Sequence, residues 1–158
     1  MNHPAVEEWR RGEYVVSTDA SKLDLAVVHR WLSEQSYWVP GIPYDVVRRG
    51  VEGSLNFGLY AEDGARTVGL ARIVTDYATF AYVCDVFVLD EYRGRGLGVW
   101  LMACVAAHPS LRGFRRWMLG TKDAHTLYEK TGFKPVAAPD RWMEKADPNV
   151  YNADPMTH

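Results

Sequence analysis

The chain has 158 residues, of which 47% are hydrophobic and 24% charged, the composition of one ordinary globular domain. Its 18 basic and 20 acidic residues give a net charge of −2, so no bulk field attracts nucleic acid or an anionic membrane. No apolar stretch approaches membrane-spanning length, and the polar N-terminal segment lacks the apolar core of a signal peptide. We therefore expect a cytoplasmic protein with no nucleic-acid or membrane partner.

The first half of the sequence predicts a strand, two helices and two further strands. Residues 13–18 read as a short strand, and Ser21 with Asp24 three residues later predicts the start of a helix. Pro43 suits the first turn of a second helix that ends near residues 50–53. Residues 55–61 and 67–76 are strand-like, and Asp63-Gly64 between them predicts a hairpin.

The second half continues with a third strand of this meander at residues 81–89. A nearly all-apolar helix over residues 96–108 follows, which predicts burial against a sheet. Residues 115–121 predict a strand parallel to 81–89, because a helix connects the two. Asp123 then caps a helix that runs to residue 131, with Gly132 as its left-handed terminator. A short strand at residues 141–145 and a loosely held tail at 147–158 complete the prediction.

Six residues, Arg93-Gly94-Arg95-Gly96-Leu97-Gly98, lie between the predicted strand 81–89 and the apolar helix. Glycines allow the backbone to approach an anion, and the first turn of a helix offers unpaired N–H groups. A P-loop would need lysine after the last glycine, where Val99 stands, and the dinucleotide fingerprint would need glycine at the same position. The segment therefore predicts a phosphate site of another kind, or only a flexible turn.

A second motif, Leu127-Tyr128-Glu129-Lys130-Thr131-Gly132-Phe133, follows about thirty residues after this R-x-x-G-x-G loop. Together the two motifs resemble the GNAT superfamily of acetyl-CoA-dependent N-acetyltransferases. The resemblance implies a single α/β (α+β) domain over residues 13–146. Its fold would be a central mixed, mostly antiparallel sheet of six to seven strands flanked by about four helices.

The resemblance also implies which residues bind acetyl-CoA. The glycine-rich loop would bind the pyrophosphate, and one strand would pair its backbone with the pantetheine arm. Thr121 stands where many family members have Asn, and its hydroxyl can still form a hydrogen bond. The expected cofactor-binding residues are Val86, Phe87, Val88, Arg93, Gly94, Arg95, Gly96, Leu97, Gly98 and Thr121.

The same resemblance places Tyr128 near the cofactor sulfur, where it would protonate the departing thiolate. Asp85, in the strand that would line the reactive end, is the candidate base, although it could instead face water. Asp76 and Tyr77 are the alternatives, and they could instead bind the acceptor. Four residues are candidates for acceptor binding, with core packing as the alternative for the two aromatics of the first loop: Tyr37, Trp38, Asp76 and Tyr77. The two cysteines are expected to be buried thiols. The five histidines lack metal-ligand spacing, so no metal is expected.

The leading prediction is an N-acetyltransferase that transfers the acetyl group of acetyl-CoA to a primary amine by direct attack in a ternary complex. The amine could belong to a small molecule or a peptide, and a homodimer is possible. The alternatives are a non-catalytic acyl-CoA-binding regulatory module and a mononucleotide-binding protein, which the absent lysine disfavours.

Overall fold

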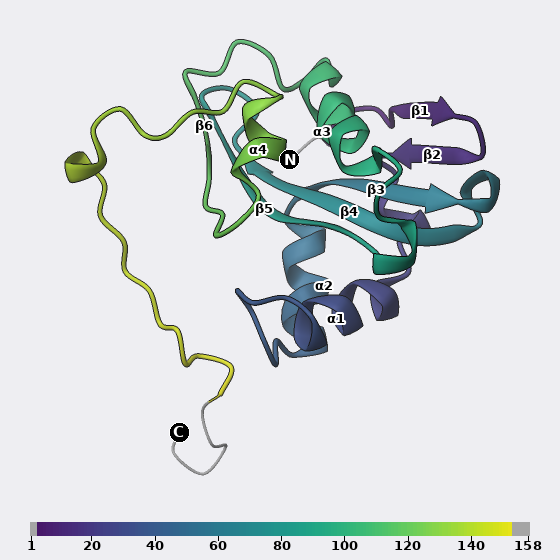
Figure 1. Ribbon diagram of the computed structural model, residues 1–158, viewed down its shortest axis with the longest axis horizontal. Helices are drawn as coiled ribbons and strands as arrows, with labels where there is room; N and C mark the ends of the chain where they lie inside the picture. Colours follow the sequence, from purple (N-terminus) through teal and green to yellow (C-terminus); the bar gives the residue numbers. More distant parts are fainter. Residues whose placement is uncertain (1–2, 153–158) are drawn as a thin grey trace.

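The computed structural model describes residues 3–152 and contains a six-stranded sheet with helices on both faces (Figure 1). Helices α1 and α2 cover one face, and α3 and α4 cover the other. The strands are β1 (Glu8–Arg11), β2 (Tyr14–Ser17), β3 (Leu55–Ala61), β4 (Arg66–Thr75), β5 (Phe80–Val88) and β6 (Arg116–Leu119). The helices are α1 (Leu25–Glu34), α2 (Tyr44–Glu52), α3 (Leu97–Ala107) and α4 (His125–Glu129).

The strands lie in sequence order across the sheet, β1-β2-β3-β4-β5-β6. Every neighbouring pair is antiparallel except β5 and β6, which are parallel. This exception follows from the chain path, because α3 crosses over one face of the sheet between these two strands. The predicted parallel pair and the predicted fold class are both confirmed.

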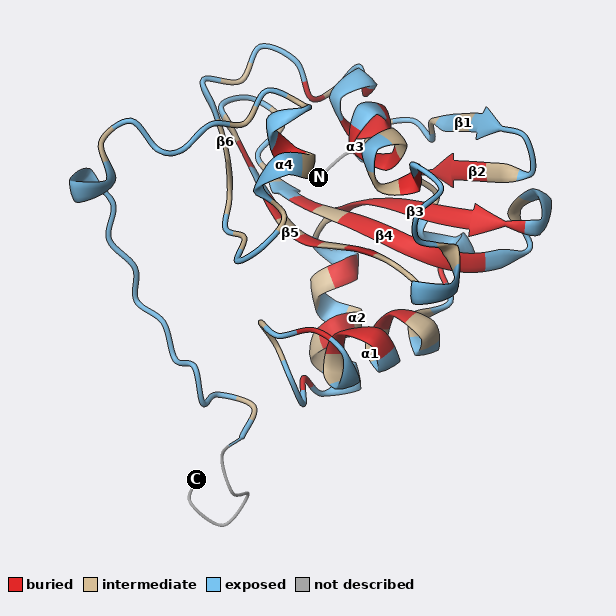
Figure 2. Ribbon diagram, viewed as in Figure 1, coloured by how far each residue is buried: buried red, intermediate tan, exposed pale blue. Residues whose placement is uncertain are grey.

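The sheet separates two hydrophobic clusters, and its central strands β3 and β4 are almost entirely buried (Figure 2). On one face, Val28 and Leu32 of α1 pack toward the sheet, and Trp31 stacks on Phe87 of β5 with ring centroids 4.4 Å apart. On the other face, α3 contributes five buried side chains. The predicted burial of α3 against the sheet is therefore confirmed for one side of the helix, while Val99, Ala103, Ala106 and Ala107 on its other side are exposed.

Several predicted elements have different bounds in the structure. The first strand is preceded by β1, which pairs with β2 as a hairpin across Gly12. Helix α1 begins at Leu25 with Asp24 as its N-cap, because the Asp24 carboxylate accepts the N–H groups of the first turn. Residues 141–145 form no strand, so the prediction of a last strand is wrong.

The prediction that Asp123 caps the last helix is also wrong. The residue before α4 is Ala124, and its N–H donates to the Thr121 hydroxyl at 3.0 Å. The terminator is confirmed, since Gly132 has φ +95° and the helix ends three residues earlier. Hence α4 is a single short turn whose position depends on Thr121.

Residues 147–152 of the predicted tail end in a turn, in which Tyr151 packs against the cluster around α1 and α2, and residues 153–158 lie outside the described part. Within residues 3–152, no helix is both long and apolar enough to cross a membrane. The domain limits and the cytoplasmic location stay predictions.

Candidate active site

The site begins where β5 and β6 separate. Their pairing runs from Phe80 opposite Arg116 to Val83 opposite Leu119. Strand β5 then continues to Val88 without β6, paired only with β4 on its other side. The backbone groups of β5 beyond Val83 therefore have no strand partner on this side. Unpaired main-chain groups of an extended segment are ready partners for the amides of a ligand.

A β-bulge in β5 lies at this point of separation. Arg72 of β4 pairs with Asp85, while the next residue, Ile73, pairs with Val83, so Cys84 is the extra residue. Bulges increase local twist and redirect side chains, and they are common beside active sites. Here the bulge lies beside the last pair that joins β5 to β6, where the two strands diverge.

The glycine-rich loop connects β5 to α3 at one end of this gap. Gly94 and Gly96 have φ angles of +78° and +74°, which non-glycine residues adopt only with strain. Gly96 is the N-cap residue of α3, so the free N–H groups of the first helical turn face the loop. A Cβ at Gly94 would meet nothing within 4 Å, and one at Gly98 would meet only Leu127 at 3.9 Å. The backbone of the loop is therefore open to a ligand.

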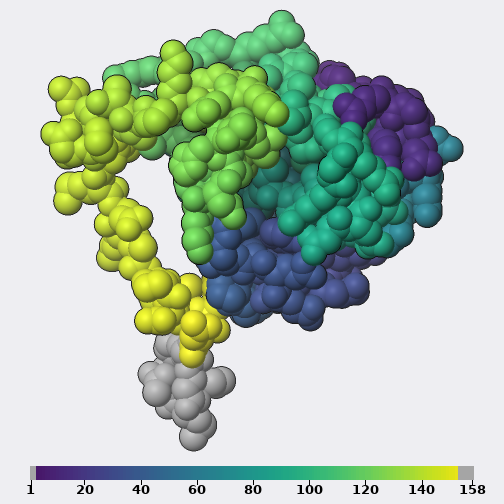
Figure 3. Space-filling view, viewed as in Figure 1, coloured from purple at the N-terminus to yellow at the C-terminus, as the bar shows by residue number. Residues whose placement is uncertain are grey.

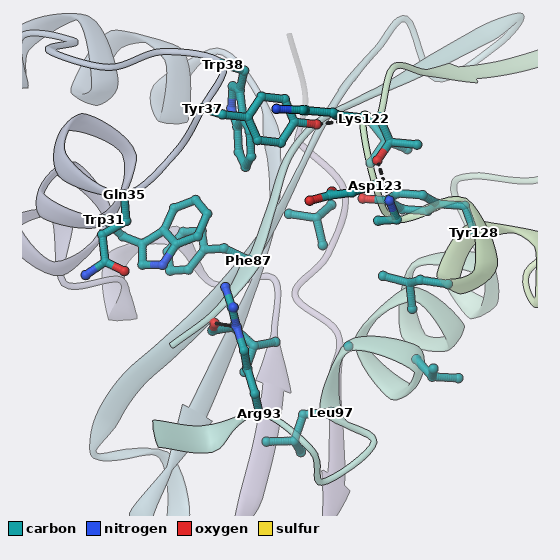
Figure 4. A pocket seen from close by; sticks show the side chains of 18 of the residues that line it. Trp31, Gln35, Tyr37, Trp38, Phe87, Arg93, Leu97, Lys122, Asp123 and Tyr128 are labelled. Carbon is teal, nitrogen blue, oxygen red and sulfur yellow. Dashed lines mark hydrogen bonds between the residues drawn. The ribbon is translucent and has the colours of Figure 1, made fainter. Parts of the chain in front are cut away.

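The two arginines of the loop have different surroundings. Arg93 lines the cavity, and its guanidinium donates to the Val88 carbonyl at 3.2 Å (Figure 4). Arg95 points away from the cavity and donates to the Tyr14 hydroxyl at 2.7 Å, with its guanidinium 5.2 Å from the centre of the Tyr92 ring. Arg95 thus fastens the loop to β2, and its side chain does not line the cavity.

A cavity of about 1010 Å³ extends from this loop to the far end of the gap (Figure 4). Of the expected cofactor-binding residues, all but Arg95 line it. Its walls come from the loop after α1, from β5, from the glycine-rich loop with α3, and from the segment between β6 and α4. The two sequence motifs therefore border one continuous cavity, although they are far apart in the chain.

Tyr128 enters the cavity from α4, and its side chain points toward the middle (Figure 4). The residue is 9% exposed, and burial, followed by the nearby Tyr37 and Asp123, raises the pKa of its hydroxyl to about 12. Its ring packs against Phe133 of the same motif at 5.9 Å. The hydroxyl therefore keeps its proton at neutral pH and can donate it inside the cavity.

Tyr37 and Trp38, which the sequence analysis named as candidates for acceptor binding, line the cavity from the loop after α1. The Tyr37 hydroxyl accepts a hydrogen bond of 2.8 Å from the backbone N–H of Lys122, and the Lys122 ammonium lies 5.6 Å from the Tyr37 ring centre. Tyr37 and Trp38 contact each other edge to face at 5.0 Å. This bridge connects the loop after α1 with the segment before α4, across the cavity.

Asp85 lies behind this wall and does not line the cavity. One carboxylate oxygen accepts the Trp38 indole N–H at 2.9 Å, and the other accepts the Arg72 guanidinium at 2.7 Å. Asp85 is 6% exposed. Although burial alone would lower the pKa of Arg72, the pairing with Asp85 raises it. Both oxygens are thus engaged in fixing Trp38 and Arg72, which does not favour Asp85 as a base.

Asp76 and Tyr77 lie in the turn before β5, and neither lines the cavity. The Asp76 carboxylate accepts hydrogen bonds from the Thr79 hydroxyl and from the backbone of residues 78–80, which together hold its pKa far below the usual range. Tyr77 has φ +59° and packs against the core. These contacts stabilise the β4–β5 turn, so both residues have a role in the fold.

Several lining residues carry no signal in the sequence. Asp123, predicted as a helix cap, instead points into the cavity, and among the described residues its side chain is the one carboxylate of the lining (Figure 4). Lys122, Trp31 and Gln35 also belong to the lining. They come from segments that no short motif connects, so only the packing of α1 and α4 over the gap brings them together.

Comparison with known proteins agrees with this geometry. The model of the GNAT acetyltransferase domain matches residues 56–135. A Gibberella zeae protein described as an acetyltransferase is 33% identical over 150 residues, covering 82% of this chain and 84% of its own.

A GNAT-family structure from Xanthomonas campestris is 46% identical, covers 96% of this chain and all of its own, and superimposes with a TM-score of 0.83. A Clostridium acetobutylicum acetyltransferase with acetyl-CoA shares the fold at 17% identity, with a TM-score of 0.61, and covers 84% of this chain and 94% of its own. The chain therefore belongs to the GNAT family of acetyltransferases, whose co-substrate is acetyl-CoA.

Proposed function

We propose that the protein transfers the acetyl group of acetyl-CoA to a primary amine by direct attack, with both substrates bound together. The observation that supports this most is the position of Tyr128. Its protonated hydroxyl points into a cavity that has the glycine-rich loop at one end and the aromatic wall of Tyr37 and Trp38 opposite. One cavity thus offers separate places for an anionic donor and for an acceptor.

Acetyl-CoA would be bound mainly by backbone groups of the protein. The N–H groups of the loop and of the first turn of α3 would bind the pyrophosphate, because Gly94 and Gly98 leave the space over them open. Arg93 adds positive charge to this end of the cavity. The backbone of β5 from Val86 to Val88, which has no strand partner on the cavity side, would exchange hydrogen bonds with the amides of the pantetheine arm, although the Val88 carbonyl already accepts one from Arg93.

Tyr128 would act as the general acid. Acetyl-CoA supplies an activated thioester. When the amine nitrogen forms its bond to the carbonyl carbon, the carbon–sulfur bond breaks and the sulfur leaves as a thiolate. With a pKa of about 12, Tyr128 is protonated at neutral pH and would donate its proton to that sulfur. The ammonium form of the acceptor would first lose one proton to water, which gives its nitrogen the lone pair that attacks. The second proton, released from the nitrogen as the amide forms, would also pass to water.

Asp123 and the aromatic wall would bind the acceptor. An amine approaches as an ammonium ion, and the Asp123 carboxylate would attract it into the cavity. The Trp38 ring adds a favourable contact for a cation, while the Tyr37 ring already has the Lys122 ammonium 5.6 Å from its centre. We propose that Asp85 acts through Trp38, by fixing the indole, rather than by accepting a proton itself.

Two measurements, made one after the other, test this function. Calorimetric titration with acetyl-CoA, ATP and NAD should give binding for acetyl-CoA alone; binding of ATP or NAD without acetyl-CoA would overturn the donor. A panel of primary amines, read by thiol release and by mass spectrometry of the acetylated amine, should then give turnover. Acetyl-CoA binding without turnover on any amine, peptide N-termini and lysine side chains included, would indicate a non-catalytic module.

A further inference from the structure

The tip of the β1–β2 hairpin, defined here as residues 11–14, has no role in the chemistry proposed above. Strand β1 lies at the edge of the sheet, and all of its residues except the half-buried Trp9 are exposed. Trp9 attaches the hairpin to the core by stacking on Phe57, with ring centroids 5.9 Å apart. The chain then turns at Gly12, where φ is +61°. The tip is therefore a well-anchored turn whose side chains are free to contact something other than the core.

Two hydrogen bonds join this tip to one residue of the glycine-rich loop. The Arg11 guanidinium donates to the backbone carbonyl of Arg95 at 2.9 Å, and the Arg95 guanidinium donates to the Tyr14 hydroxyl at 2.7 Å. Arg11 and Tyr14 lie opposite each other in the hairpin. In Figure 3 the purple atoms of the hairpin lie against the green atoms of the loop and of α3. One cross-strand pair thus holds both the main chain and the side chain of Arg95.

Arg11 also contacts the start of α3. Its guanidinium carbon lies 5.3 Å from the centre of the Trp100 ring. A Cβ placed on Gly96, the N-cap residue of α3, would lie 3.6 Å from the Nη2 atom of Arg11. The guanidinium therefore packs against the loop and against the helix that follows it, which fixes one relative to the other.

The loop needs such a contact because its glycines permit more than one backbone conformation. Rotation of the peptide between Arg95 and Gly96 changes mainly ψ of Arg95 and φ of Gly96, and glycine allows φ of either sign. The peptide is trans, so its C=O and N–H groups point in opposite directions. A rotated peptide would direct the carbonyl of Arg95, instead of the N–H of Gly96, at a bound anion.

The hydrogen bond from Arg11 favours one of these two orientations. Gly96 lines the cavity, whereas Arg11 and Arg95 do not. The carbonyl that Arg11 holds therefore points away from the cavity, which leaves the N–H of Gly96 on the cavity side. There it lies next to the free N–H groups of the first turn of α3. A hydrogen bond from a charged donor is stronger than a neutral one, so it can hold an exposed loop.

We propose that Arg11 is a positioning residue for acetyl-CoA, and that it acts by holding the glycine-rich loop in its anion-binding conformation. This role rests on the proposed binding of the pyrophosphate by the loop. Arg11 would not touch the donor. It would raise the fraction of molecules whose loop is ready to bind, and the apparent affinity is proportional to that fraction.

The first test is isothermal titration of the full chain with acetyl-CoA. Arg11→Met keeps an unbranched side chain beside Trp100 but removes the hydrogen-bond donor. The Kd should rise about 10-fold, as expected if about one molecule in ten keeps the loop in place without the contact. Arg10→Met is the matched control and should bind as the wild type does. It removes the same charge from the neighbouring residue, which lies opposite Val15 and faces the other side of the hairpin.

Kinetics distinguish a displaced loop from a general loss of structure. With an amine that serves as acceptor, Arg11→Met should raise KM for acetyl-CoA about 10-fold, while kcat and the unfolding midpoint stay unchanged. S-acetylpantetheine, the part of acetyl-CoA without the pyrophosphate and the nucleotide, should give the same kcat/KM in Arg11→Met and in the wild type. An equal loss with this shorter donor would overturn the proposal, because Arg11 would then affect the whole cavity.

Wild-type affinity for acetyl-CoA in Arg11→Met would also overturn the proposal. An equal loss of affinity in Arg10→Met would do the same, because net charge would then explain both variants. Gly98→Asp shows whether the donor site itself is wrong. If Gly98→Asp loses binding and Arg11→Met keeps it, only the role of Arg11 fails. If both variants bind normally, the pyrophosphate does not bind at the loop, and both proposals fail.

Discussion

The two ends of the cavity are built in different ways. The proposed donor end is local: β5, the glycine-rich loop and α3 follow one another in the chain, and the proposed anion site consists of their own backbone. The acceptor end depends on contacts between distant residues. Tyr37 bonds to the backbone of Lys122, 85 residues away, and Trp38 bonds to Asp85, 47 residues away. We therefore expect the geometry of the donor end to tolerate substitutions elsewhere in the chain, except at the hairpin tip. The geometry of the acceptor end should be lost when one of these two long-range hydrogen bonds is broken.

The largest effect is expected at the donor end, from Gly98→Asp. The new carboxylate would stand over the N–H groups of the first turn of α3 and repel the pyrophosphate, so acetyl-CoA affinity should fall by about 100-fold or more, which corresponds to about 3 kcal/mol. Isothermal titration measures the loss. Ala103→Asp, on the exposed side of the same helix, is the control and should bind normally. Normal binding by Gly98→Asp would remove the loop from the donor site.

The next effect tests the chemistry between the two ends. Tyr128→Phe removes the proton donor but keeps the ring against Phe133, so kcat should fall by about 100-fold at unchanged acetyl-CoA affinity. Steady-state kinetics and titration measure the two quantities. Tyr82→Phe, which alters another tyrosine of the lining, should leave kcat nearly unchanged. Full activity in Tyr128→Phe would leave the thiolate to be protonated by water.

The third effect tests the assembled acceptor end. Asp85→Asn leaves the buried Arg72 guanidinium without its counter-charge, so the free energy of unfolding should fall by about 2 kcal/mol, less than for a fully buried pair. Urea unfolding measures the change. Asp45→Asn, which breaks exposed ion pairs on α2, is the control and should not shift the midpoint.

Kinetics of the same variant show whether Asp85 acts through Trp38. In that case Asp85→Asn and Trp38→Phe should each raise KM for the amine about 10-fold. The double variant should have the same KM as either single variant, because both substitutions break the same Trp38–Asp85 hydrogen bond. A base would behave differently, with a large loss of kcat in Asp85→Asn that adds to the effect of Trp38→Phe.

The smallest effect concerns the packing beneath α3, the helix that carries the donor loop. His108 is fully buried beside Trp9 and Phe57, and burial lowers its pKa. Below pH ~6.5 the unfolded chain therefore takes up a proton that the folded protein does not. Stability should fall as the pH is lowered, by at most about 1.4 kcal/mol per pH unit.

Chemical unfolding between pH 7.5 and 5.5 measures how the free energy of unfolding changes with pH. The slope should correspond to uptake of about one proton on unfolding. In the wild type, the N–H of Ser110 donates to the His108 imidazole at 3.1 Å. His108→Asn keeps an acceptor for this N–H and should remove the pH dependence of stability. The same slope in both proteins would assign it to other groups.

The sequence predicted the parts of the fold whose signals are local. Apolar runs and the Asp63-Gly64 turn located β3, β4 and β5, and the glycines located the loop and the end of α4. Strand β1 has no apolar alternation, because its residues are mostly exposed, and only pairing with β2 makes it a strand. The segment 141–145 has strand-like residues but no strand partner among residues 3–152.

The candidate site divides in the same way. The open backbone conformation of residues 93–98 at the start of α3 was predictable, since glycine conformation and helix N-termini are properties of a few consecutive residues. The surroundings of Asp85 and Arg95 were not, because Trp38, Arg72 and Tyr14 reach them from other strands and loops. A side chain's partners are set by packing, which the spacing of residues along the chain does not encode.

By itself, then, the sequence determined the order of the elements, the parallel pair β5–β6 and the place of the donor loop, all of which follow from local geometry and chain connection. Only the tertiary structure decided where β5 and β6 part, that Asp123 and not Asp85 lines the cavity, and that residues 134–150 form no strand on the sheet. These three features depend on which surfaces meet after folding, and burial and hydrogen-bond satisfaction settle that only when the whole chain is packed.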